Sequence, residues 1–275
     1  MKYSQQGLTA SQIASVRIFS GGIVLLPFAV FHISKIPGHK MGLVILSAVF
    51  GNFLPAFLFA AAISKIDSSL AGIMNSLTPI CVVVIGFLFF KDKIKAQKIA
   101  GVLVGFSGLL LLTFLPILVE HKTIGLYNLD YSLLIILATL VYGMNVNIVS
   151  HRLQGINPIQ LATVSLSFMI IPTAIVLWQQ DFLQLDFSEA TIRWSVMASV
   201  LLGVVGSAIA TALFYILVKR AGGLFASLVT YGIPFVALLW GFVYGEKITL
   251  SEVIGLGIIL FGVYLANRPD KIENN

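Results

Sequence analysis

The chain has 275 residues, of which 58% are hydrophobic and only 10% are charged. A soluble domain is nearer a quarter charged, so the composition excludes a soluble globular protein and predicts an all-α integral membrane protein. The net charge of +6 lies mostly in short segments between apolar runs, which indicates orientation in a membrane and argues against a nucleic-acid partner.

Nine apolar segments are long enough to cross about 30 Å of hydrocarbon, and charged residues mark the breaks between them. In chain order, the expected spanning helices cover 10–33, 41–63, 69–90, 97–118, 131–150, 158–178, 194–217, 222–244 and 250–267. A further amphipathic piece lying in the membrane plane is weakly indicated at 182–192.

One pattern of prolines and glycines occurs twice along the chain. The pairs 155 positions apart are Gly51 and Gly206, Leu58 and Leu213, Pro79 and Pro234, and Gly86 and Gly241. The pairs 154 positions apart are Lys93 and Lys247, Gly101 and Gly255, and Gly108 and Gly262. We therefore expect a first repeat at 1–118, a second repeat at 131–267 and a tail at 268–275. A duplicated membrane domain points to a transporter.

The second repeat holds one helix more than the first. Gln12 recurs as Gln160, 148 positions later, so the first helix matches the sixth and the helix at 131–150 has no counterpart after Met1. Either the chain is a truncated or late-start form of a ten-helix protein, or it is a true nine-helix variant. We expect the first, since a missing helix would leave a groove. A unit of five helices is odd, so the repeats should be inverted in the membrane.

Charges in the connecting segments predict the orientation independently. With a cytoplasmic C-terminus, eleven lysines and arginines lie inside and five lie outside, with Arg17 in the first helix. Positive residues collect in cytoplasmic loops, so we expect the C-terminus inside. The expected location is a bacterial inner membrane.

Polar side chains within apolar helices are costly and need a partner or a wet cavity. Eight such residues are the candidates for substrate binding: Asn52, Asn75, Tyr142, Asn145, Ser207, Thr211, Tyr215 and Tyr231. Each alone could be an interhelical hydrogen bond, but together they are expected to line one cavity. Arg17 either faces this cavity, where it could meet a substrate carboxylate, or extends to the outer interface, which we slightly favour.

Prolines interrupt the third and eighth helices at matching places. Pro79 and Pro234 each free a backbone carbonyl four residues earlier, and Gly232 precedes the second break. Paired breaks in two repeats point to a central site with hinges, although a plain kink fits as well. Glycines are expected to space close helix packing. They are Gly101, Gly105 and Gly108 in one helix and Gly255, Gly257 and Gly262 in its counterpart.

Several kinds of chemistry have no support in the sequence. No Asp or Glu lies in the middle of a predicted helix, so neither a proton relay nor a carboxylate sodium site is evident. The single cysteine, Cys81, and histidines at helix ends predict no metal site. Phosphate-binding and hydrolase motifs are missing, which predicts no cofactor and no enzymatic activity. The cavity should suit a neutral, amphipathic or zwitterionic solute.

The repeated motifs resemble a known family. The runs 71–79 and 226–234, each ending in proline, are followed by an aromatic half-helix, a charged turn and a glycine-spaced helix. This order is similar to that of the drug/metabolite transporter superfamily, in its EamA-like branch of ten-helix carriers. The resemblance implies export of small metabolites, such as amino acids, or of toxic compounds, by alternating access.

The sequence therefore predicts a secondary transporter for a small metabolite, as a monomer or homodimer. The alternative is a receptor or assembly factor that transports nothing.

Overall fold

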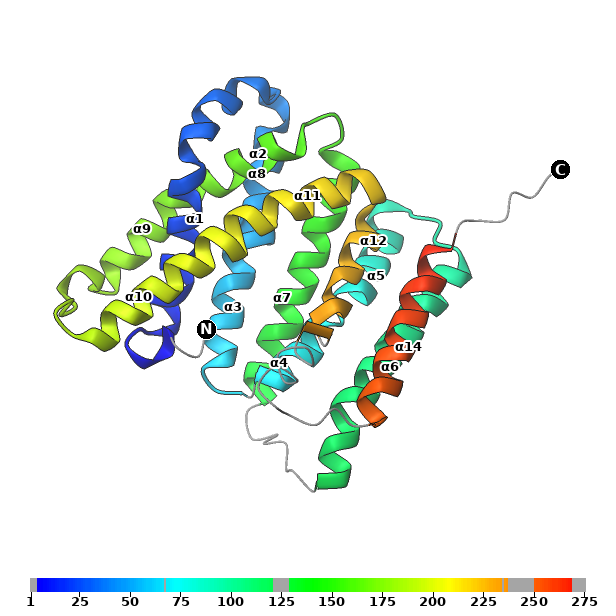
Figure 1. Cartoon of the computed structure of the whole chain (residues 1–275). Helices are drawn as coiled ribbons and strands as arrows, with labels where there is room; N and C mark the ends of the chain where they lie inside the picture. The colour runs from blue at the N-terminus through cyan, green and yellow to red at the C-terminus, as the bar shows by residue number, and fades with distance from the viewer. Residues whose placement is uncertain (1–3, 67, 121–128, 234, 237–249, 269–275) are drawn as a thin grey trace.

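The computed structural model describes residues 4–66, 68–120, 129–233, 235–236 and 250–268, and these residues are helical with no strand among them. The first repeat comprises η1 (Ser4–Gln6), α1 (Ala10–His32), η2 (Ile33–Lys35), α2 (Gly38–Ala48), η3 (Val49–Phe53), α3 (Leu54–Ile63), α4 (Ser68–Asn75), α5 (Thr78–Phe90) and α6 (Ala96–Glu120). The second comprises α7 (Leu129–Asn147), η5 (Ile148–Arg152), α8 (Pro158–Phe168), α9 (Ile170–Gln179), η6 (Phe182–Gln184), α10 (Ala190–Gly203), η7 (Val204–Ile209), α11 (Ala210–Ala221), α12 (Gly223–Ser227), η8 (Leu228–Gly232) and α14 (Leu250–Asn267). Figure 1 shows them as one bundle.

Helices of membrane length confirm the predicted class. Among the described residues, five spans are long and apolar enough to cross a membrane: Ala10–Lys35, Gly38–Ile63, Asp130–Arg152, Pro158–Gln179 and Ala190–Ala221. Shorter apolar helices cover Thr78–Phe90, Ala96–Leu111, Gly223–Gly232 and Val253–Asn267. The expected in-plane helix at 182–192 does not form, because that segment holds only the turn η6 and the start of α10.

Local sequence sets several helix ends. At the start of α1, the Thr9 hydroxyl accepts from the Gln12 amide at 3.3 Å and the Gln12 side chain accepts from the Thr9 amide at 2.9 Å. This reciprocal cap satisfies two backbone donors that have no partner within the helix. Asn157 caps α8 in the same way, accepting from the Ile159 amide at 2.9 Å, with Pro158 in the first turn.

Matching helices of the two repeats run antiparallel. The start of α1 meets the end of α9, where Gln12 Nε2 donates to the Gln180 carbonyl at 3.0 Å. The end of α1 meets the start of α8, where His32 Nδ1 lies 2.9 Å from Thr163 Oγ1. Likewise Gln97, at the start of α6, donates to the Leu265 carbonyl near the end of α14 at 3.1 Å. Inversion of the repeats, expected from the odd number of helices, is present in the structure.

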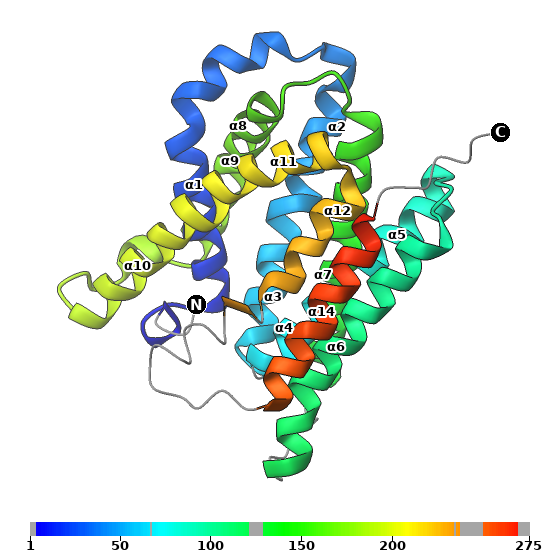
Figure 2. The same cartoon turned by 45° about the vertical axis from the view of Figure 1, so that its right-hand side comes forward.

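Glycines bring α6 and α14 into backbone contact, and the two helices lie side by side in Figures 1 and 2. A Cβ atom on Gly101 would meet the backbone of Ala266, and one on Gly108 would lie 2.9 Å from the Gly255 carbonyl oxygen. The predicted glycine packing is confirmed here, as expected where small residues let membrane helices approach. Gly257 was wrongly included, because a Cβ atom added to it would have no neighbour within 4 Å.

The second helix of the first repeat and its counterpart, the third helix of the second repeat, contain a π-helical turn at the same place. η3 begins at Val49 and η7 begins at Val204, 155 residues later. Such turns insert an extra residue, redirect the neighbouring side chains and occur often at functional sites. Gly51 and Gly206 lie within these turns.

The predicted break at Pro79 separates α4 from α5. The Thr78 hydroxyl donates to the Asn75 carbonyl at 2.5 Å, so the carbonyl that the proline leaves unbonded has a local partner. In the second repeat, the short α12 passes into the 3₁₀ turn η8, which contains Gly232. Pro234 lies outside the described residues.

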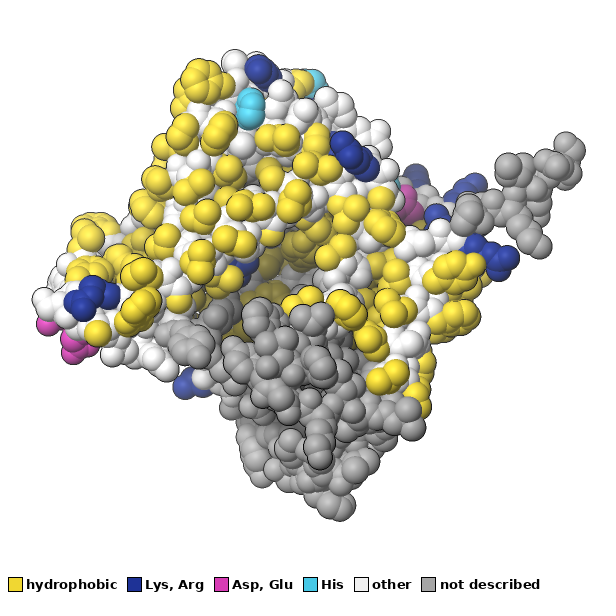
Figure 3. Space-filling view, viewed as in Figure 1, with side chains coloured by type: hydrophobic (Ala, Val, Ile, Leu, Met, Phe, Trp, Pro, Cys, Tyr) yellow, Lys and Arg dark blue, Asp and Glu magenta, His cyan; other side chains and the backbone are white. Residues whose placement is uncertain are grey.

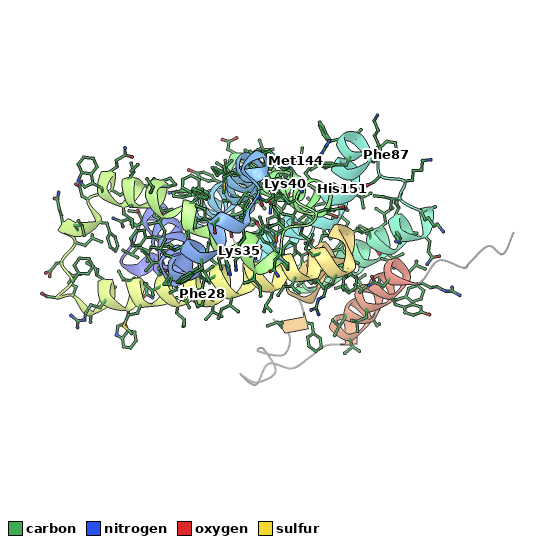
Figure 4. All side chains as sticks on the ribbon, turned by 90° about the horizontal axis from the view of Figure 1, so that it is seen from above. Phe28, Lys35, Lys40, Phe87, Met144 and His151 are labelled. Atoms are coloured by element: carbon green, nitrogen blue, oxygen red, sulfur yellow. The ribbon has the colours of Figure 1, made fainter. Side chains whose placement is uncertain are left out.

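Basic residues gather at one end of the bundle, which we call the basic end. Lys40 Nζ donates to the Gln154 carbonyl at 2.7 Å, and Lys219 Nζ donates to the neighbouring Leu153 carbonyl. In the view from above, Lys35, Lys40 and His151 are labelled near this end, and Phe87 lies at the outer edge (Figure 4). The face in Figure 3 is otherwise largely apolar, as a bilayer requires.

Candidate functional site

A polar cavity lies between the two repeats, with a volume of about 400 Å³. α1, η3, α7, η7, α11 and η8 contribute its lining, which consists of Arg17, Gly51, Asn52, Tyr142, Asn145, Gly206, Ala210, Thr211, Leu213, Phe214, Tyr215, Leu217 and Val229. In Figure 3 the surface is hollowed below α11, the helix that supplies six of these residues.

Arg17 faces this cavity and does not extend to the interface. Its Nε donates to Ser207 Oγ on η7 at 2.8 Å. The two helices approach closely at this level, since a Cβ on Gly203 would overlap Ser20 and the Arg17 carbonyl. The close approach holds the guanidinium among the helices, so the less favoured of the two sequence-based alternatives describes the structure.

A buried hydrogen-bond network joins three helices beside Arg17. Ser47 Oγ donates to Asn145 Oδ1 at 2.6 Å and lies 3.1 Å from the Tyr215 hydroxyl oxygen. All three side chains are at most 1% exposed. The network therefore ties α2 to α7 and α11 and fixes the side of the cavity that Asn145 occupies.

Asn52 mirrors this arrangement on η3. Its Oδ1 accepts from Thr211 Oγ1 on α11 at 3.0 Å, across the repeat boundary. The amide nitrogens of both Asn52 and Asn145 are buried without an acceptor in hydrogen-bonding geometry, although the Tyr215 hydroxyl lies beside them. Buried donors of this kind are rare and call for an explanation.

Aromatic rings form the apolar side of the cavity. Tyr142 on α7 and Phe214 on α11 lie with their ring centroids 5.5 Å apart, and Tyr142 is within electrostatic range of Arg17. The Gly51 backbone lies against Asn145 and the Tyr215 hydroxyl, and a Cβ atom there would lie 3.2 Å from that hydroxyl oxygen. The cavity thus offers hydrogen-bond donors at one end and rings at the other.

The structure brings together most of the candidate residues but not all. Asn52, Tyr142, Asn145, Thr211, Tyr215 and Arg17 line the cavity, and Ser207 holds Arg17. Tyr231 lies elsewhere, because its ring packs on Gly105 and its hydroxyl donates to the Val102 carbonyl at 2.9 Å. Asn75 and Pro79 lie at the α4–α5 break, outside the lining, and Gly232 is exposed.

Sequence reasoning missed Ser47 and the two π-helical glycines as parts of the site. Ser47 is fully buried and bonds to two of the candidate residues. Its signal was present, because a serine in an otherwise apolar helix needs a partner. Gly51 and Gly206 were used only to align the repeats, although a recurring glycine beside polar positions indicates a close approach.

A second cavity, of about 550 Å³, lies at the basic end between the α5–α6 connection, α12 and the end of α14. Asp92 Oδ1 lies 2.8 Å from His151 Nε2 there, while His151 Nδ1 lies 2.9 Å from the Asn147 carbonyl oxygen. Both side chains are about one-third exposed, and neither lines the cavity that contains Arg17. Within the described part of the chain, no His, Cys, Asp or Glu cluster could hold a metal ion.

Comparison with known proteins decides the family. Residues 1–114 and 131–268 match the EamA-like transporter family, one match for each repeat. The chain belongs to the EamA-like transporter family. It is therefore a multi-pass membrane transporter rather than an enzyme, and the resemblance to the drug/metabolite transporter superfamily is confirmed.

Relatives agree along nearly the whole chain. An "uncharacterized transporter" of Archaeoglobus fulgidus is 25% identical, over 98% of this chain and 92% of the relative. A chloroplastic WAT1-related protein of Arabidopsis thaliana is 21% identical, over 94% of this chain and 63% of the relative. A solved crystal structure shares the fold of this EamA-like transporter, with a TM-score of 0.73 and 18% identity, over 96% of this chain and 88% of that one.

Proposed function

We propose that this EamA-like transporter is a secondary carrier that moves a small amphipathic metabolite by alternating access, in the export direction. The cavity between two inverted repeats carries this proposal. Helices from both repeats supply its polar groups, as in inverted-repeat carriers whose site lies between the halves. The direction follows the family resemblance, and the excess of Lys and Arg in predicted inside loops supports a cytoplasmic C-terminus.

Irregular helical segments support such movement. The π-helical turns η3 and η7 and the turn η8 contribute lining residues and interrupt regular helical hydrogen bonding at the cavity, while the break between α4 and α5 lies outside the lining. Interrupted helices can change direction at small cost, whereas an intact helix cannot. We infer that α4–α5 and α12–η8 flex while α6 and α14, joined through glycines, move as one unit.

Counterflow in proteoliposomes tests this function. Purified protein should exchange labelled solute for unlabelled solute from a broad metabolite panel, and Tyr142→Ala should reduce the exchange rate at least tenfold with unchanged folding. The matched control is Tyr264→Ala, which removes an exposed ring on α14. Absence of exchange for every solute, with protein verified as folded, would instead favour a receptor or assembly factor.

A further inference from the structure

The cavity contains a positive charge, held among the helices by Arg17, without a negative partner among the described residues. Arg17 is hydrogen-bonded through Nε to the neutral Ser207, and no other hydrogen bond joins its guanidinium to the residues that the structure describes. None of the lining residues that the structure describes is Asp or Glu. A charge held inside a membrane bundle without a counter-charge is costly, so its retention indicates a role in binding.

Two amides beside Arg17 present further donors to the same space. The Asn52 and Asn145 oxygens accept from Thr211 and Ser47, and their nitrogens lie beside the Tyr215 hydroxyl without an acceptor in good hydrogen-bonding geometry among the described residues. Asn145 is 1% exposed, so solvent outside the protein does not satisfy its nitrogen. A guanidinium whose terminal nitrogens have no described acceptor, beside two amide groups poorly satisfied by the Tyr215 hydroxyl, matches a ligand group that accepts hydrogen bonds.

We propose that the cavity binds a carboxylate-bearing organic anion, with the carboxylate at Arg17 and the apolar part against Tyr142 and Phe214. The planar guanidinium binds a carboxylate through two parallel hydrogen bonds. This inference rests on the proposed transport function. It replaces the neutral or zwitterionic solute that the sequence predicts with a solute that carries a net negative charge. An ammonium group would find no carboxylate in the described part of the lining.

The proposal also accounts for transport without a coupling ion. The membrane potential is negative inside, so it favours the exit of an anion. Net export of a monoanion moves one negative charge outward, and the carrier becomes electrogenic. Imposing an inside-negative potential with valinomycin and potassium should therefore speed efflux of the anion from proteoliposomes.

The binding test uses matched probes on the purified full chain. Thermal unfolding is measured with aliphatic carboxylates from butanoate to octanoate and with 3-phenylpropanoate. The same measurement is made with three analogues of 3-phenylpropanoate: the neutral 3-phenylpropanamide, the cationic 3-phenylpropylammonium and the zwitterionic phenylalanine. We expect a carboxylate of this series to raise the melting temperature of the protein. The amide and the ammonium compound should leave the melting temperature unchanged, and phenylalanine should bind with at least tenfold lower affinity than the effective carboxylate. Stabilisation by none of the carboxylates, or equal stabilisation by a counterpart, overturns the proposal.

Arg17 variants separate binding from a structural role. Arg17→Gln should bind the effective carboxylate at least tenfold more weakly, yet melt at an equal or higher temperature without ligand, because it removes an uncompensated charge. Arg17→Lys should keep part of the affinity. The control Arg220→Gln removes an exposed arginine at the end of α11, and it should change neither the carboxylate affinity nor the melting temperature without ligand. Loss of folding in Arg17→Gln, or unchanged carboxylate affinity, contradicts the proposal.

Transport distinguishes this inference from the proposed function. If a carboxylate binds at Arg17 but no solute shows counterflow, the transport proposal is wrong and the anion site is supported. If a neutral solute shows counterflow at a rate that Arg17→Gln does not change, the transport proposal is supported and the anion site is wrong.

Discussion

Single buried side chains hold the polar cavity in shape. Ser47 is central to this hydrogen-bond network, because its hydroxyl contacts both Asn145 and Tyr215. All three side chains are at most 1% exposed. In a bilayer interior, a lost hydrogen bond is not replaced by water, although interhelical bonds are individually modest.

Ser47→Ala should lower the stability of the purified protein by about 1–2 kcal/mol, because two buried polar groups lose a partner. Thermal unfolding in detergent measures the change as a fall in melting temperature. The matched control is Ser107→Ala on α6, an exposed serine whose hydroxyl bonds only to the Val104 carbonyl of its own helix. Equal effects of the two substitutions would show that the Ser47 network contributes no stability.

Close packing between helices decides the fold at the next scale. α6 and α14 touch through backbone atoms, so their contact depends on the absence of side chains at Gly101, Gly108 and Gly262. Such an interface tolerates little change in volume, since neither backbone can move without disturbing its own helix.

Gly101→Leu should therefore destabilise the protein by more than about 3 kcal/mol and reduce the yield of folded material, because Leu would overlap the Ala266 backbone. Monodisperse yield after size-exclusion chromatography is the readout. Gly257→Leu on α14 is the control, as its side chain would meet open space. Normal yield of Gly101→Leu would mean that α6 and α14 do not pack as described.

The Asp92–His151 contact links the end of α5 to η5, and its strength should be small. Both partners are about one-third exposed, and ion pairs near solvent contribute about 0.2–1 kcal/mol. A double-mutant cycle with Asp92→Ala and His151→Ala, read by thermal unfolding, should give a coupling energy in that range. A coupling well above it would assign the pair a larger role in holding the cavity at the basic end.

At the scale of the whole molecule, composition and apolar runs predicted the class and the approximate helix positions, and the internal repeat predicted the inversion. The repeat could be recognised because Pro79, Gly86 and Gly101 recur at nearly constant spacing, which requires no knowledge of contacts. The position of Arg17 could not be predicted, because its partner Ser207 is 190 residues away and depends on how α1 packs against η7. Tyr231 was misplaced for the same reason, since a buried hydroxyl can bond to a backbone carbonyl as well as face a cavity.

Alternation of access is the central claim, and cysteine accessibility at Thr211 tests it most directly. Thr211 lines the cavity on α11, and Cys81 can be replaced by serine so that Thr211→Cys introduces the only thiol. A membrane-impermeant thiol reagent, added to one side of oriented proteoliposomes at a time, measures the rate of labelling from each side. The account predicts labelling from both sides, slowed by a bound carboxylate. Labelling from one side only, or from neither, in folded protein would contradict it.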